Sequence, residues 1–237
     1  MRIFKYLLFL TILWVTGISQ SLCQKSISGS FVIEGKISLP FSGVAFIHYF
    51  DYQKNEYRKD SGIILQQQFK IQGFLKEPTY ATLYLQRDKN TQTDTINTAY
   101  FLMIEPSTIQ LQAGKYMNDL VVKGSVYHDD YVDFLRIDKS FQKSIDSVQA
   151  LMRRSNMAND TLTSKKYHEF VKQLRKTQCV KVYSKMVVDK RNSIFSIFIL
   201  QRMLRFEYNR NTIRKLFLQL TPRIKNTNAA KELYNVL

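Results

Sequence analysis

The clearest pattern in the chain is a strict alternation of apolar and polar residues within positions 59–73. Phe69 and Ile71 fall on one face of an extended segment, and Lys70 and Gln72 fall on the other. Such alternation is typical of a half-buried antiparallel strand that has one face on a core and one in water. We interpret residues 59–73 as a polar turn and an apolar rise followed by this strand. Because the neighbouring segments repeat the pattern, we predict that it is a central strand of an all-β half.

Similar short segments lie before and after this strand, with Gly, Pro, Asp or Asn at the turns between them. The pattern predicts strands at residues 30–37, 44–50, 56–59, 80–85, 100–105, 109–111 and 120–122. Residues 44–50 are apolar on both faces, which predicts a central position, and the polar stretch 87–97 predicts an exposed loop. About seven or eight strands at this spacing, with no helical period between them, predict a β-sandwich or a partly open barrel.

After residue 127 the period of the apolar residues becomes that of a helix. The pattern predicts five helices, with a polar break at 155–164 between the first and the second. The first starts near Asp129 and Asp130, the second runs through Met186, a mostly apolar and deeply buried third covers 194–206, a fourth is capped by Thr212, and a last covers 228–237. The sequence therefore predicts an α+β protein: an N-terminal antiparallel β-sandwich or partly open barrel over residues 24–126, followed by a C-terminal helical bundle over residues 127–237.

The first 23 residues have the plan of a secretory signal peptide. A short basic start is followed by an apolar run at residues 6–15 and then by small and polar residues up to Cys23. The run is shorter than the roughly 20 residues of a spanning helix, so we predict cleavage after Cys23 and export to the periplasm or cell envelope. A retained membrane anchor and a lipid-modified Cys23 are the alternatives, although Leu22 is bulkier than a lipidation site favours.

The charge lies mainly in the helical half. Residues 24–126 carry 11 Lys and Arg against 9 Asp and Glu, whereas residues 127–237 carry 22 against 10. A basic half can attract nucleic acid, anionic lipid or an acidic partner, and it can also be an ordinary solvated surface. Export argues against nucleic acid, so we predict no nucleic-acid partner and retain contact of the basic helices with a membrane surface through lipid headgroups as an alternative.

The sequence offers few residues for chemistry. If Cys23 leaves with the signal, Cys179 is the only thiol; Lys176 and Lys181 make it a candidate reactive thiol, and a buried inert cysteine is the alternative. His128 stands beside two aspartates, but adjacent helical residues point in different directions, so we interpret it as a surface residue and predict no metal site. Glycines occur singly, with no phosphate-binding loop, and we predict no cofactor and no catalytic residue.

Several segments together resemble one known family. They are FVIEG at 31–35, DS at 60–61, FKIQG at 69–73, EP at 77–78, FLMIEP at 101–106, VKGS at 122–125 and DY at 130–131. The family is the β-rich domain of unknown function that precedes the thioredoxin-like domain in exported thiol-disulfide oxidoreductases of Gram-negative envelopes. The helical stretch around Asn192 and Ser193 resembles the spacer between those two domains.

This chain departs from the family in three places. The family tends to have Gly where this chain has Gln67 and Ser107, which predicts altered turns because Gly is favoured where φ is positive. The redox chemistry of the relatives requires a Cys-x-x-Cys, and the chain has none. We therefore expect a protein that is not an enzyme: a binding or interaction module of the envelope whose partner protein or ligand is unknown. The alternative is the N-terminal docking or oligomerisation part of an oxidoreductase whose thioredoxin-like domain is truncated or encoded separately.

Overall fold

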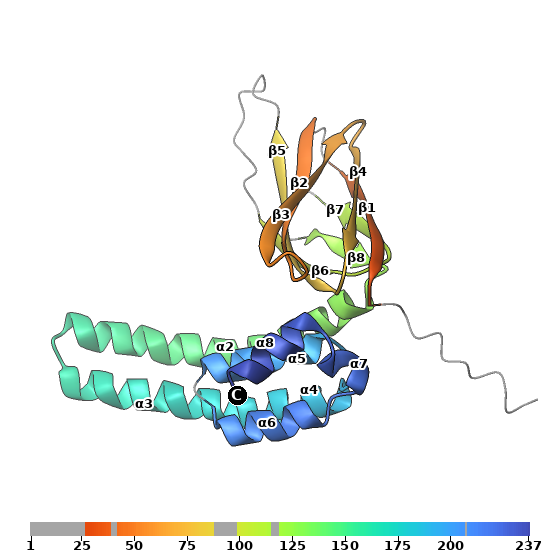
Figure 1. The fold of residues 1–237 in the computed structure, drawn as a ribbon. Helices are drawn as coiled ribbons and strands as arrows, with labels where there is room; N and C mark the ends of the chain where they lie inside the picture. Colours follow the sequence, from red (N-terminus) through yellow and green to blue (C-terminus); the bar gives the residue numbers. More distant parts are fainter. Residues whose placement is uncertain (1–26, 39–41, 88–98, 115–118, 207) are drawn as a thin grey trace, which may run out of the picture.

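The computed structural model describes residues 27–38, 42–87, 99–114, 119–206 and 208–237. A β-sandwich stands on a layer of helices (Figure 1). The strands are β1 Gly29–Ile37, β2 Gly43–Asp51, β3 Glu56–Ile64, β4 Gln68–Leu75, β5 Thr79–Arg87, β6 Tyr100–Ile104, β7 Thr108–Ala113 and β8 Val121–Lys123. The signal peptide predicted over residues 1–23 and most of the loop predicted over 87–97 lie outside the described residues.

The sandwich consists of two four-stranded sheets. Their strand orders are β4-β1-β7-β8 and β3-β2-β5-β6. Alternate side chains of both sheets point inward and are buried, among them Phe69 and Ile71, as the alternation predicted. The rings of Phe31 and Tyr49 meet edge to face between the sheets, with centroids 5.9 Å apart. The predicted α+β class, with strands first and helices after, is confirmed.

Two predictions about the sheets are wrong. β4 is an edge strand and not a central one, because within its sheet it pairs only with β1. The strand that precedes it in the chain, β3, belongs to the other sheet. The two strands approach so closely that a Cβ on Gly62 would lie 2.1 Å from the Lys70 carbonyl oxygen. The sandwich is also not purely antiparallel, because the chain crosses between the sheets after β6 and brings β7 alongside β1 in parallel.

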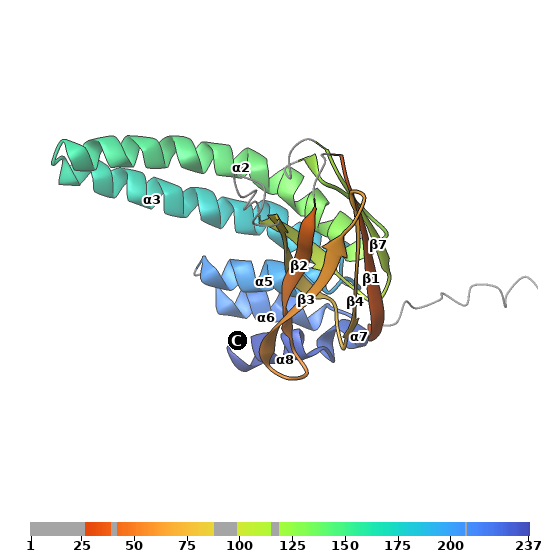
Figure 2. The same ribbon diagram turned by 90° about the horizontal axis from the view of Figure 1, so that it is seen from above.

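The helical layer contains a long hairpin and a compact group of shorter helices. The helices are α2 Val126–Met157, α3 Thr161–Gln178, the π-helix η2 Cys179–Tyr183, α4 Ser184–Asp189, α5 Phe195–Arg205, α6 Arg210–Leu218, α7 Pro222–Lys225 and α8 Asn228–Asn235. α2 and α3 run side by side away from the sandwich in both views (Figures 1 and 2). Among the described helices, none combines the length and the apolar character that a membrane span requires.

The structure confirms some details of the predicted helices and corrects others. α5 is the most deeply buried, as its apolar pattern predicted. The predicted break at 155–164 is a short turn between Met157 and Thr161. α6 is capped by Asn209, whose side chain accepts a hydrogen bond from the Thr212 amide at 3.1 Å, and not by Thr212 itself.

The turn between β3 and β4 explains one departure from the family pattern. Gln66 and Gln67 both have positive φ, at 48° and 65°, in a two-residue turn closed by reciprocal 2.9 Å backbone hydrogen bonds between Leu65 and Gln68. Hairpin turns of this kind favour Asn-Gly, because positive φ costs a residue with a Cβ about 1–2 kcal/mol. Ser107 is not among the described residues with positive φ.

Replacing Gln66 and Gln67 with Asn and Gly should therefore stabilise the protein by about 1–2 kcal/mol, because the new residues adopt positive φ with less strain. Thermal unfolding should show a higher midpoint by several degrees. Gln72→Gly, at an exposed position within β4, is the matched control and should lower the midpoint. An unchanged or lower midpoint in the double variant would contradict the assigned turn.

Candidate functional site

The first turn of α2 covers the free edge of β6. The Met103 amide donates to His128 Nδ1 at 3.3 Å, and the Ser125 hydroxyl donates to the Met103 carbonyl at 3.3 Å. Ser125 also caps α2 by accepting from the His128 amide at 3.0 Å, and Glu105 accepts from the Val126 amide at 2.7 Å. The amide and the carbonyl of Met103, on the edge strand β6, are thus both hydrogen-bonded to side chains at the start of α2.

A second junction joins β5 to the end of the chain. Glu77 lies just before β5 and is buried, and its carboxylate accepts from the amides of Asn228 and Ala229 at 2.7 and 2.8 Å. These are the first amides of α8, where the helix dipole favours a negative charge. Burial raises the pKa of the Glu77 carboxyl, and the two backbone hydrogen bonds act in the opposite direction.

The two halves enclose a pocket of about 450 Å³, which we call the junction pocket. Its wall combines aromatic and aliphatic side chains with two arginines. The lining residues are Tyr80 and Phe101 from β5 and β6, Tyr131, Phe134 and Leu135 from α2, and Phe195, Phe198, Ile199, Arg202 and Arg205 from α5. The rings of Tyr80 and Phe198 are close, with centroids 4.3 Å apart. A concave, mainly apolar site with a few convergent polar groups is typical of a ligand site.

Arg202 is held at the pocket by a buried polar cluster. Its guanidinium donates to Asp138 at 2.9 Å and to the Tyr183 hydroxyl at 3.0 Å. Asp138 also accepts from Tyr183 and Gln178, which stand at the two ends of the π-helical turn. A π turn bonds residues five apart and so brings these two side chains onto one face. The irregular turn therefore supports the carboxylate that orients Arg202.

The tyrosines of the junction pocket stay neutral at physiological pH. Burial raises the pKa of the Tyr80 phenol well above its usual value, and the charges of Arg202 and Arg205 oppose this only in part. Burial likewise raises the pKa of Tyr131. Both hydroxyls are therefore hydrogen-bond donors, beside two guanidinium groups that are always charged.

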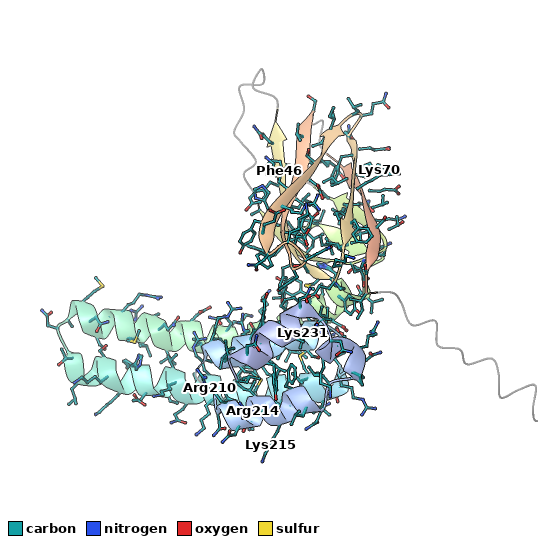
Figure 3. All side chains as sticks on the ribbon, in the orientation of Figure 1. Phe46, Lys70, Arg210, Arg214, Lys215 and Lys231 are labelled. Atoms are coloured by element: carbon teal, nitrogen blue, oxygen red, sulfur yellow. The ribbon has the colours of Figure 1, made fainter. Side chains whose placement is uncertain are left out.

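A second hollow lies on the outer face of the sheet β4-β1-β7-β8. This groove of about 740 Å³ is lined by a mixture of polar and apolar side chains, which includes the exposed Ile63, Leu65 and Val121. Lys70, labelled in Figure 3, forms an ion pair with Glu34 there at 3.5 Å. Phe69 is the one aromatic residue in the described lining of the groove, whereas six aromatic residues line the junction pocket beside its two arginines, so we regard the junction pocket as the stronger candidate site.

The residues singled out in the sequence do not form a common site. Cys179 begins the π-helix, and its side chain lies outside the described part of the structure, so its reactivity remains a prediction. His128 is not the surface residue we predicted: it is buried because its ring bonds to β6. Arg214 and Lys215 project from α6 on the side of the helical layer away from the sandwich (Figure 3), and their contact with a membrane surface remains a prediction.

The residues of the junction pocket were not identified from the sequence. Phe195, Phe198, Arg202 and Arg205 recur at helical spacing along one face of α5, so two rings are followed by two arginines. This order of residues indicates a helix face that is apolar at its beginning and charged at its end. It does not show that β5 and β6 supply the opposite wall, because this depends on the tertiary fold.

Comparison with known proteins identifies the sandwich. Residues 31–131 match the domain of unknown function DUF4369. The DUF4369 match confirms the predicted resemblance to a domain of unknown function. It runs through all eight strands except the first two residues of β1, and it ends at Tyr131, inside α2. The matched region thus includes Ser125 and His128, which join α2 to β6.

Other comparisons add little to the DUF4369 match. A search of curated proteins found no match. Among solved structures the chain is similar to the solution structure of CBM25-1 of the beta/alpha-amylase from Paenibacillus polymyxa, with 17% identity and a TM-score of 0.27 over 42% of this chain and 94% of that one. A likeness of this size carries no argument about function.

The junction at His128 should make stability depend on pH. Burial lowers the pKa of His128 from 6.5 to about 4, so the unfolded state binds a proton that the folded state excludes. Between pH 6.5 and about 4 the free energy of unfolding should therefore fall as pH falls, by up to about 3 kcal/mol. Urea unfolding across this range measures the effect.

His128→Asn is the informative variant, because its amide oxygen can still accept from the Met103 amide but does not titrate. It should lose the part of the pH dependence that His128 contributes. His168→Asn, at an exposed position on α3, is the matched control and should retain the slope of the original protein. Equal slopes in the original protein and in His128→Asn would refute a buried neutral His128.

Proposed function

We propose that this protein is an exported, non-catalytic binding module of the cell envelope, and that it binds its ligand in the junction pocket. The observation that carries the proposal is the lining of the pocket. Rings and aliphatic side chains from both halves converge there with two arginines, and the described lining contains no thiol, hydroxymethyl, imidazole or carboxylate group. Such a surface is suited to holding a ligand, not to activating a nucleophile or transferring a proton at neutral pH.

Export is the part of the proposal that rests on the sequence. A basic start, an apolar run and a small-residue site precede Gln24. The match to a domain of unknown function supports a binding module without naming its compartment or partner. Placement in the envelope of a Gram-negative cell follows from the resemblance of the sequence to exported proteins.

The full-length chain expressed in a Gram-negative host should be recovered from the periplasmic fraction with Gln24 as its first residue. The purified protein should show no disulfide-reductase or thiol-peroxidase turnover above buffer, because no Cys-x-x-Cys is present. Cys179→Ser is the matched control. Turnover in either protein would overturn the non-catalytic assignment, and retention in the cytoplasm would overturn export.

A second candidate is the docking or oligomerisation half of a thiol-disulfide oxidoreductase. It is favoured because the segment that matches the domain of unknown function, residues 31–131, is the one that carries most of the resemblance to those enzymes. In that case the catalytic dithiol lies in a separate or adjoining polypeptide.

The DNA that follows the codon for Leu237 tests this second candidate. A thioredoxin-like segment with Cys-x-x-Cys, in frame or in the adjacent gene, is the expected result if the protein is the docking half. The adjacent product should then form a complex with this chain in analytical ultracentrifugation. Absence of such a segment in the neighbouring DNA excludes this candidate.

A further inference from the structure

We infer that the junction pocket binds a small monocarboxylate with an aromatic or other apolar body. This inference deepens the proposed function and rests on it, because it names the class of ligand for the same site. The argument uses the shape of the pocket, its charge, its neutral donors and its position between the two halves.

The walls define the body of the ligand. Eight of the ten lining residues are aromatic or aliphatic. The pocket volume of about 450 Å³ falls in the range of about 300–1,000 Å³ that is usual for small-molecule sites. The Phe101 ring is 58% exposed although it belongs to the wall, so apolar surface remains for a ligand to cover. An aromatic body would stack against rings from both halves.

The charges define the head group. Aromatic cages often bind cations, but Arg202 and Arg205 at this wall would repel one. Asp138 neutralises Arg202 through its 2.9 Å ion pair, whereas Arg205 has no carboxylate partner among the described residues. Among the described residues one positive charge is thus left without a carboxylate partner, which suits a monoanion. A guanidinium binds a carboxylate with charge-assisted hydrogen bonds.

Two neutral donors complete the head-group site. The described residues provide no hydrogen-bond partner for the hydroxyls of Tyr80 and Tyr131, and burial keeps both phenols protonated. A carboxylate accepts hydrogen bonds from phenols and from guanidinium groups, whereas an ammonium group cannot accept any. A phenol can also accept a hydrogen bond, so it is the guanidinium groups, which only donate, that select an acidic ligand over a basic one.

The position of the pocket gives binding a structural consequence. Tyr80 and Phe101 belong to the sandwich, while Arg202 and Arg205 belong to α5. A ligand that contacts both halves binds the assembled protein and not the separated halves, so it must raise the unfolding temperature.

Three compounds with one body and different head groups provide the test: 4-phenylbutyrate, 4-phenylbutanol and 4-phenylbutylamine. Titration calorimetry with the full mature protein should show 4-phenylbutyrate binding about tenfold more tightly than the alcohol, because only the acid forms a charge-assisted hydrogen bond with Arg205. The amine should not bind, because the two guanidinium groups repel it. Thermal unfolding should show the same order of stabilisation.

Two pairs of variants locate the site. Arg205→Gln should weaken 4-phenylbutyrate about tenfold and leave 4-phenylbutanol unchanged, whereas Arg214→Gln, at an exposed position of α6, should change neither. Phe101→Ala should weaken both compounds, whereas Phe74→Ala, a similarly exposed ring on β4, should weaken neither. All four positions are exposed, so the variants should fold, and circular dichroism verifies this.

The outcomes separate the ligand class from the site. Equal affinity for the acid and the alcohol, with loss of both in Phe101→Ala, overturns the carboxylate inference and leaves the pocket as a binding site. No binding of any compound overturns both. Tighter binding of Gly-Gly-Phe than of 4-phenylbutyrate would assign the pocket to the C-terminal carboxylate of a peptide and overturn the small-molecule assignment.

Discussion

The hydrogen bonding of Met103 at the edge of β6 is the constraint on which the junction depends. Met103 is fully buried, so water cannot satisfy its outward amide and carbonyl, and an unsatisfied buried group costs about 1–3 kcal/mol. His128 and Ser125 supply the two partners from the first turn of α2. Since these bonds fix where α2 starts against β6, they also carry Tyr131 and Phe134, further along the helix, to the wall of the junction pocket.

The α5 wall of the pocket depends on a partly buried ion pair between Asp138 of α2 and Arg202 of α5. Removing Arg202 would leave the buried carboxylate of Asp138 without its charged partner. Tyr183 and Gln178 bond to the same carboxylate through the π turn. The irregular turn is thus part of the support of the pocket, because a regular α-helix would direct residues five apart to different faces.

Local patterns in the sequence predicted most of the elements and little of their arrangement. Alternation at Phe69 and Ile71 identified a buried strand face, but one buried face is compatible with an edge or a central strand, and β4 is an edge strand. The all-apolar run of α5 identified the most buried helix correctly. His128 was misread as a surface residue, because a polar residue at a helix start gives no local sign of a tertiary partner. The junction pocket escaped prediction for the same reason: its two walls are far apart in sequence.

The sandwich and the helices must be regarded as one structural unit. The match to the domain of unknown function ends at Tyr131, yet Glu77 within the matched region has its carboxylate bonded to the first amides of α8. Without α8 this carboxylate would lose both partners, and without α5 the ring of Tyr80 would lose its contact with Phe198. The matched region therefore contains only three of the ten lining residues of the pocket, and the helical half supplies both of its guanidinium groups. The pocket proposed as the binding site thus depends on an arrangement that neither half provides by itself.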